Sequence, residues 1–424
     1  MGRVWTLHRA SASDNGSIIE GEIYMTSEAA LADAPFLDAA SPAFSIRSEA
    51  VRRARAQSWF ARTPYGLAVL RHREVGELLN RPSLIQGSHN WPALNGVPEG
   101  LFADWWRRTI LMTEGEDHWR LRRLVNPAFS PQVVKALMPD FERISIDLTA
   151  AFVDRGACDF MAEFADPYAA RVLCLLLGLP EDQAGFILKN AADMGLALGV
   201  NYRAEIDRIE AATRALSDHV ADVLHDRRRR PGDDLLSRMV QASDGCDRLT
   251  PEELHNLTLM LIFAGVDTTR NQLGLGIAMF IDHPDQWEAL AANPALDMAA
   301  ATEVMRTRPT ITWVTRLATE DFDYGGIAIR EGTVLHLYSE SAGTDPEVFG
   351  EAPFDITATR ARNYGFGGGI HHCLGNIVAR NDMAVAYRIL SARIGPPRAD
   401  GEATWLADSG NTGPISLPIA FDRR

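Results

Sequence analysis

A glycine-rich turn that carries a single cysteine constrains this chain more than any other segment. Residues 366–375 read Phe-Gly-Gly-Gly-Ile-His-His-Cys-Leu-Gly, and a helix-like run starts at Asn376. The glycines let the backbone turn and approach a flat ligand closely, because they carry no Cβ atom. A thiolate just ahead of a helix N-terminus is stabilised by the helix dipole and by unpaired N–H groups, and it can be an axial ligand of haem iron. Taken alone, Cys373 could also be an ordinary buried cysteine.

The composition limits the classes of protein to which this chain can belong. The chain has 424 residues, of which 46% are hydrophobic, and a net charge of −14. This is enough apolar material for a large core, and the acidic balance argues against nucleic acid as a partner. No run of about 18 apolar residues predicts a membrane span, and the first residues lack the apolar segment of a signal peptide. We therefore expect a soluble, cytoplasmic protein without a membrane anchor.

Helical periodicity dominates the chain from about Phe36 onward, and no repeat or long linker divides it. The predicted helices cover residues 73–80, 132–152, 181–198, 203–226, 251–282 and 376–394. Short β-like runs cover residues 66–71, 322–329, 333–338 and 414–421. The prediction is a mainly α fold with small β-sheets, in which residues 36–424 form one large domain and residues 1–35 a loose N-terminal segment. Residues 226–234, with four arginines, are typical of a solvated connector. The sequence does not decide whether Met1 or Met25 is the true start of the protein.

The run 257–271 is apolar nearly all round in its first half, so this helix should be buried. Its middle nevertheless holds Gly265, Asp267 and Thr268, although a helical glycine costs about 0.5–1 kcal/mol and an unpaired buried carboxylate costs more. Thr268 can donate to the carbonyl of Ala264 and bend the helix. An opening there would hold a diatomic ligand and a water, to which Asp267 and Thr268 could relay protons. The alternative is a kinked helix whose polar groups satisfy one another.

Five blocks occur along the chain in one order. They are His118-Trp-Arg-Leu-Arg122, Ala264–Thr269, Glu303-Val-Met-Arg306, Arg316 and the Cys373 loop. In this order they resemble the blocks of the bacterial-type soluble cytochrome P450 monooxygenases, whose haem loop has the pattern Phe-x-x-Gly-x-His-x-Cys-x-Gly. The resemblance runs from roughly Phe36 to Phe421. It implies the cytochrome P450 fold, a single large domain that encloses haem b.

The resemblance also implies a role for each block. Cys373 would be the axial thiolate ligand of the iron, Asp267 and Thr268 would deliver protons to bound O2, and Glu303 and Arg306 would form a structural pair behind the haem. The residues implied to bind the haem or its propionates are His118, Arg122, Ala264, Arg316, Phe366, Gly367 and His371.

Two positions depart from the family pattern. Ala358 stands where the family usually has an arginine, and Arg360 is the candidate to replace it. Gly343-Thr344 stands where the family usually has Asn-Arg. The second departure bears on local packing and not on the chemistry.

The implied function is oxidation of a small molecule with O2. Two electrons would come from a separate protein, which we expect to be a ferredoxin with its NAD(P)H-driven reductase, and the protein would be a monomer. A docking patch for that partner could include Arg120, Arg123, Arg362 and Arg380. The substrate to be hydroxylated would be a medium-sized hydrophobic molecule such as a terpenoid, steroid or aromatic. The segments implied to form its pocket are residues 85–112, Met260, Phe263, Ile311, Trp313, Val314 and residues 409–414.

Other interpretations keep part of this evidence. The same fold could act as a peroxygenase or catalyse dehydration or coupling, but the intact Asp267-Thr268 pair argues for oxygen activation. A non-catalytic haem-thiolate binder or sensor is a second alternative, although no signalling segment is attached. Zinc bound by residues 371–373 is a third, but consecutive residues rarely converge on one tetrahedral ion.

The four cysteines, at positions 158, 174, 246 and 373, show no paired spacing, so we expect no disulfide framework.

Overall fold

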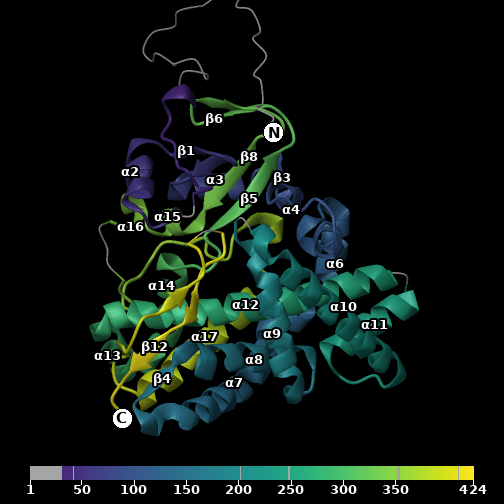
Figure 1. Cartoon of the computed structure of the whole chain (residues 1–424), viewed down its shortest axis with the longest axis vertical. Helices are drawn as coiled ribbons and strands as arrows, with labels where there is room; N and C mark the ends of the chain where they lie inside the picture. The colour runs from purple at the N-terminus through teal and green to yellow at the C-terminus, as the bar shows by residue number, and fades with distance from the viewer. Residues whose placement is uncertain (1–30, 42, 201, 247–248, 351–353, 409) are drawn as a thin grey trace, which may run out of the picture.

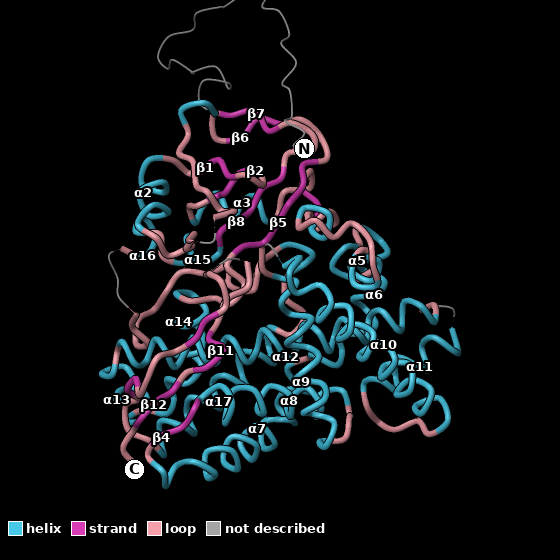
Figure 2. Tube along the Cα trace, viewed as in Figure 1, coloured by secondary structure: helices cyan, strands magenta, loops and turns pink. Residues whose placement is uncertain are grey.

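The computed structural model describes residues 31–424 apart from residues 42, 201, 247–248, 351–353 and 409, and it does not describe the side chains of residues 245 and 246. The fold is mainly α with small β-sheets, as the sequence predicts. Figure 1 shows the largest sheet with α2 (Glu49–Gln57) and α3 (His72–Leu79) at one end of the molecule, and most of the long helices at the other. The secondary-structure view shows the same division into a sheet part and a helical part (Figure 2).

The largest sheet has five strands in the order β1-β2-β8-β5-β3. β1 and β2 form an antiparallel hairpin, β8 runs parallel to β2, and β5 lies antiparallel between β8 and β3. This order brings the edge strand β3 beside β5, with Gln86 opposite Arg316. The strands are β1 (Phe60–Thr63), β2 (Gly66–Val69), β3 (Leu84–Gln86), β5 (Trp313–Ala318) and β8 (Val334–Tyr338). The smaller sheets use β4 (Ala157–Asp159), β6 (Phe322–Tyr324), β7 (Ile327–Ile329), β9 (Arg398–Ala399), β10 (Thr404–Trp405), β11 (Pro414–Ser416) and β12 (Pro418–Ala420).

The 32-residue helix α12 (Pro251–Asp282) crosses the helical part (Figure 1). It begins with a capping box, in which the Thr250 hydroxyl accepts from Glu253 N at 3.1 Å and the Glu253 carboxylate accepts from Thr250 N at 2.8 Å. These bonds satisfy backbone donors that a helix start leaves unpaired. The other helices of this part are α7 (Pro131–Phe152), α8 (Asp166–Leu177), α9 (Ala184–Gly195), α10 (Ile206–Arg229), α11 (Leu235–Cys246), α13 (Pro284–Ala292), α14 (Asp297–Thr307) and α17 (Asn376–Arg393).

Shorter helices connect the two parts. α6 (Gly115–Val125) carries the predicted His118 block, and a 3-10 turn, η9 (Gly369–His371), forms part of the Cys373 loop. The remaining short helices are α4 (Trp91–Leu94), α5 (Leu101–Trp106), α15 (Ser339–Gly343) and α16 (Pro346–Phe349).

Several predicted helices match the observed ones closely, while other predicted elements differ from the structure. The helices predicted at 132–152, 251–282 and 376–394 correspond to α7, α12 and α17. The run 181–198 is a 3-10 turn, α9 and a second 3-10 turn, and the run 414–421 is two separate strands, β11 and β12. α10 continues to Arg229, so the predicted connector begins later than residue 226. Arginine is a good helix former and is favoured in a last turn, where it complements the helix dipole.

The N-terminal boundary also needs correction. Residues 31–35, predicted to be loose, pack against the sheet part: Leu31 and Ala34 contact the core, and the Pro35 carbonyl accepts from Arg62 N at 2.8 Å. Residues 1–30, including the possible start at Met25, lie outside the described residues.

Two further expectations concern cysteines and membranes. Cys158, Cys174 and Cys373 are free thiols, and the side chain of Cys246 lies outside the described part. None of the helices in the described ranges is long and apolar enough to cross a membrane.

We predict that His336 makes stability depend on pH. His336 is 4% exposed in β8, with Nδ1 3.1 Å from the Thr315 hydroxyl, and burial lowers its pKa to about 4. The unfolded chain binds this proton near pH 6.5 and the folded chain does not, so the free energy of unfolding should fall between pH 6.5 and 4, by up to about 3 kcal/mol. Thermal unfolding across this range should show a shallower decline in His336→Gln. The exposed control His225→Gln should keep the wild-type slope, and a wild-type slope in His336→Gln would contradict the assignment.

Candidate functional site

The Cys373 loop is a tight turn whose backbone packs against α3 and α17. Cys373 N donates to the Phe366 carbonyl at 3.1 Å, and the Asn376 side chain donates to the Cys373 carbonyl at 2.7 Å where α17 begins. Gly369 has a φ of +68°, and a Cβ there would lie 2.6 Å from the Leu79 carbonyl oxygen, so this position requires glycine. Cys373 itself is half-buried.

The environment of the Cys373 sulfur differs from the prediction made from the helix dipole. Burial raises the pKa of the thiol, although the Gly375 N–H and the Arg122 guanidinium act to lower it. Removal from water therefore outweighs the helix N-terminus in the protein alone. A coordinated metal ion reverses this balance, since a coordinating thiol is deprotonated.

Two of the predicted propionate ligands are arginines that lie against this loop from different elements. Arg122, on α6, donates to the His372 carbonyl at 3.0 Å, and Arg316, on β5, donates to the Gly368 carbonyl at 3.2 Å. Burial lowers the pKa of both guanidiniums, and Arg316 is only 3% exposed. Among the described residues, neither forms an ion pair with a carboxylate. Two desolvated cations bound mainly to neutral carbonyls are matched to receive two carboxylates.

The two predicted histidine ligands lie beside each other, with ring centroids 4.5 Å apart. Both ring nitrogens of His118 face backbone carbonyls, those of Ile110 at 3.2 Å and Ile370 at 3.0 Å. Burial lowers the pKa of His118, which favours a neutral ring that can donate through one nitrogen only. In this structure His118 therefore ties the loop to α6, whereas His371 uses Nε2 to bond Glu114 at 2.9 Å.

The middle of α12 is accessible at Ala264, although the helix is continuous from Pro251 to Asp282. Ala264 is exposed and Gly265 and Thr268 are half-buried, although Phe263 and Val266 on the same helix are buried. The Thr268 hydroxyl donates to the Ala264 carbonyl at 2.7 Å. A helix whose first half is buried thus presents small residues and one hydroxyl to an accessible space.

Asp267 lies in a different environment from its neighbour Thr268. It is 2% exposed, and its carboxylate accepts from Asn411 at 2.8 Å, from Arg270 at 3.1 Å and from Asn271 at 3.3 Å. No hydrogen bond joins Asp267 to Thr268 in the part of the chain that the structure describes. Asn411 belongs to the predicted pocket segment 409–414, but its contact with Asp267 was not predicted, because the two lie 144 residues apart and only the fold brings them together.

Glu303 and Arg306 form a buried ion pair with two hydrogen bonds, of 2.6 and 2.7 Å. Arg360 places a second guanidinium 3.2 Å from Glu303. It supplies the positive charge that is missing at Ala358, where the family usually has an arginine. Arg306 also donates to the Gly343 carbonyl at 2.7 Å, and a Cβ at Gly343 would collide with the backbone of Arg306. This contact gives a packing reason for glycine where the family usually has asparagine.

The predicted pocket residues on β5 divide between its two faces. Val314 shares a face with Arg316 and lies next to Gly367 of the Cys373 loop. Trp313 points to the opposite face, where it is buried and stacks on Tyr338 with ring centroids 5.3 Å apart. Trp313 is therefore a core residue rather than a neighbour of Val314 in a pocket wall.

The other predicted pocket residues come from α12 and the turn before β5. Met260 is half-buried and Phe263 is buried, with the Phe263 ring 5.4 Å from that of Trp105. Ile311 forms a β-bridge with Asn411, so the turn before β5 is joined to residues 410–414. Ser409, the first residue of the predicted loop, lies outside the described residues.

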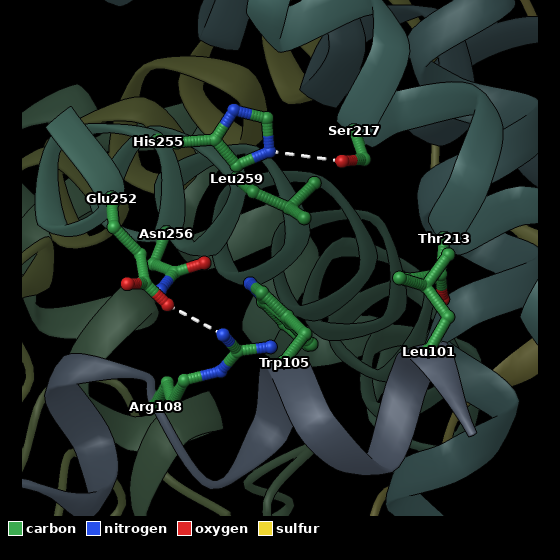
Figure 3. A pocket seen from close by; sticks show the side chains of 9 residues that line it. All are labelled: Leu101, Trp105, Arg108, Thr213, Ser217, Glu252, His255, Asn256 and Leu259. Atoms are coloured by element: carbon green, nitrogen blue, oxygen red, sulfur yellow. Dashed lines mark hydrogen bonds and ion pairs between the residues drawn. The ribbon is translucent and has the colours of Figure 1, made fainter.

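A cavity of about 220 Å³ lies between α5, α10 and α12 (Figure 3). An Arg108–Glu252 ion pair closes one side, and Ser217 contacts His255 at 2.9 Å on another. Trp105 lines this cavity and also contacts the ring of Phe263. The lining residues are Leu101, Trp105, Arg108, Thr213, Ser217, Glu252, His255, Asn256 and Leu259.

Comparison with known proteins agrees with this geometry. The family model described as Cytochrome P450 matches residues 201–390. Luteothin monooxygenase of Streptomyces thioluteus is 38% identical over 93% of this chain and 98% of its own length. The polyketide biosynthesis cytochrome P450 PksS of Bacillus subtilis is 32% identical over 74% of this chain and 78% of its own. The crystal structure of CalO2, 30% identical, superposes with a TM-score of 0.80 over 90% of this chain and 99% of that one.

The fold, the cysteine loop and these relatives define the class of protein. The chain belongs to the cytochrome P450 family. It is a haem monooxygenase, an oxidoreductase that uses O2.

The residues present fit a haem. The Cys373 sulfur is a ligand of the type that haem iron takes, and the loop beside it is contacted by the half-buried guanidinium of Arg122 from α6 and the buried guanidinium of Arg316 from β5, which suit acidic groups. Exposed Ala264 on α12 offers a small residue where a flat ring could approach the helix.

We predict that Asn411 stabilises the buried Asp267 carboxylate. Asn411→Ala should lower the free energy of unfolding by about 1–3 kcal/mol, since a buried acceptor loses its shortest hydrogen bond. Asn411→Asp should lower it further, because a second carboxylate would face the first. Chemical unfolding of haem-loaded protein would measure both, with the exposed Asn90→Ala as the control. Equal stability of all three variants would show that the contact contributes nothing.

Proposed function

We propose that this protein binds haem b through Cys373 and hydroxylates, or otherwise oxidises, a medium-sized hydrophobic molecule. The observation that supports this most is the gathering of side chains from α6, β5 and the cysteine loop itself around residues 366–373. A structural cysteine would need no such cluster of buried cations. The exposed Ala264 on α12 supports the second part of the proposal, the oxidation of a hydrophobic molecule beside this helix.

Each residue has a distinct proposed role. Arg122, Arg316 and His371 bind the two propionates, for which the planar guanidinium fork is well suited. His118 holds the loop to α6 through Ile370. Phe366, Gly367 and Ala264 pack against the haem faces. The bound haem supplies the activation of O2 and the transfer of one oxygen atom to the substrate.

Thr268 and Asp267 hold and move protons near the exposed part of α12. The Thr268 hydroxyl, bonded to Ala264 O at 2.7 Å, is the group next to accessible space. Asp267 is held by Asn411, Arg270 and Asn271, so proton delivery through this acid requires it to leave some of these donors. A positioned acid of this kind contributes roughly 10²–10⁴-fold to a proton-transfer step.

The substrate class rests on the pocket and on the relatives. Met260, Phe263, Ile311 and Val314 provide mostly apolar walls, which suit a terpenoid, steroid or aromatic molecule. One relative is named for polyketide biosynthesis. We therefore add a polyketide-type scaffold to these candidates.

The electron donor is a separate protein, for which a ferredoxin with an NAD(P)H-driven reductase is our proposal. Of the four arginines predicted to dock it, Arg123 and Arg362 are exposed. Arg120 is paired with Glu253, and Arg380 donates to the Thr302 hydroxyl at 3.1 Å. Arg123 also lies 3.8 Å from Glu116, but both side chains are well exposed to solvent, so the docking patch should depend mainly on the accessible guanidiniums of Arg123 and Arg362. A monomeric state stays a prediction.

A substrate panel is the first test of the proposal. We would titrate haem-loaded protein with polyketide lactones, terpenoids, steroids and aromatic acids and follow the spin state of the iron by absorbance. A saturable shift with one class is expected, since a substrate bound in the pocket would change the surroundings of the haem. Protein that takes up no haem, or whose haem absorption is unchanged in Cys373→Ser, would refute the ligand assignment.

We predict that Thr268→Ala separates reductant use from product formation. Product per reductant consumed should fall by about 10-fold or more, with hydrogen peroxide released instead, because the hydroxyl beside accessible space is lost. The matched control is Thr258→Ala, which removes the same bond type from the same helix, that of the Thr258 hydroxyl to Leu254 O at 2.8 Å. Wild-type coupling in Thr268→Ala would remove Thr268 from the proton path.

A further inference from the structure

A carboxylate, Glu114, lies inside the cluster of basic side chains on the Cys373 loop. Its Oε1 accepts from Gln86 N at 2.7 Å and from His371 Nε2 at 2.9 Å. Burial acts to raise the pKa of Glu114, but the bonds from His371 and Gln86, with the charge of Arg316, outweigh it and the pKa is lowered. An ionised carboxylate thus lies in a site for which the sequence motifs indicated only basic residues.

The position of Glu114 lets it join three elements. It is the residue just before α6, yet its side chain makes no capping hydrogen bond to that helix. The carboxylate turns instead to the backbone of β3, at Gln86, which pairs with Arg316 of β5. It also reaches across to His371 in the loop, 257 residues later in the chain. The acid therefore fixes the loop relative to the sheet edge that carries Arg316.

The contact also fixes the ring of His371. Because an ionised carboxylate only accepts hydrogen bonds, Nε2 must carry the proton in this bond. The His371 side chain is 7% exposed and its ring lies against that of His118. Nδ1 is then the nitrogen left for another acidic partner, to which it donates when the ring carries a second proton. An acid that orients a histidine in this way is common behind metal and cofactor sites.

We propose that Glu114 is a positioning residue for the haem propionates, which holds His371 in the orientation that binds a propionate and places one fixed negative charge beside the cofactor. The inference rests on the proposed binding of haem at Cys373. It has two separable parts, a hydrogen bond that acts on haem retention and a charge that acts on the reduction potential.

Two substitutions separate these parts. Glu114→Gln keeps an oxygen that accepts from His371 and removes the charge, whereas Glu114→Ala removes both. The control is Glu116→Gln, two residues later on α6, which removes a charge from a side chain that is 93% exposed. His371→Ala and the double variant Glu114→Ala/His371→Ala complete a cycle that asks whether Glu114 acts through His371.

Haem transfer to excess apomyoglobin measures retention, and spectroelectrochemistry at one pH measures the potential. Glu114→Ala should lose haem about 10-fold faster than wild type, whereas Glu114→Gln should lose it at nearly the wild-type rate. Both should shift the reduction potential upward, because a negative charge near the iron is removed. The double variant should lose haem no faster than His371→Ala, and Glu116→Gln should match wild type.

Several outcomes would overturn the proposal. A wild-type rate of haem loss in Glu114→Ala would remove the positioning role, and additive effects in the cycle would show that Glu114 does not act through His371. A wild-type potential in Glu114→Gln would remove the charge effect, and this variant keeps the test valid if Glu114→Ala does not fold. Failure of the proposed function would be recognised separately, since wild-type protein would then lack thiolate-ligated haem.

Discussion

The burial of positive charge beside the Cys373 loop is the constraint on which the rest of this structure depends. Arg316 is 3% exposed and Arg122 is half-buried, and in the described ranges their hydrogen bonds go mainly to backbone carbonyls. Such cations are costly to bury without a strong partner. The β3–β5–β8 sheet, α6 and the turn before α17 converge here, so the architecture is arranged around a place for acidic groups.

Two adjacent residues of α12, Asp267 and Thr268, lie in different environments. Successive residues on a helix point about 100° apart, so Asp267 and Thr268 face different neighbours although they are adjacent in the chain. Asp267 enters a buried polar network with Arg270 and Asn411, while Thr268 stays beside exposed Ala264. The pair is thus not a preformed relay, and its chemistry depends on what holds Asp267.

The sequence predicted the local features of this fold and missed the pairings between distant segments. Periodicity located α7, α12 and α17 because their apolar faces repeat over many residues. Asp267–Asn411 and Glu114–His371 join residues 144 and 257 positions apart, whereas Arg360, 57 positions from Glu303, was the candidate that the family pattern indicated. No local pattern specifies such contacts, and Glu114 before α6 resembles any acid at a helix start. The error at Trp313 has the same origin, because a strand's two faces are distinguished only by what packs on each.

The segment 410–414 links the proposed substrate pocket to the proposed proton path. Asn411 forms a bridge with Ile311 of the predicted pocket wall and donates to Asp267 at 2.8 Å. The Thr310 hydroxyl bonds Asn411 at 3.0 Å and Thr412 at 2.7 Å, which fastens this segment to the turn before β5. A ligand that displaced the proposed pocket wall would therefore also displace a donor of Asp267, since Asn411 contacts both. In the proposed function, substrate fit and proton delivery are in this way parts of one packing arrangement, because Asn411 joins the proposed pocket wall to the acid.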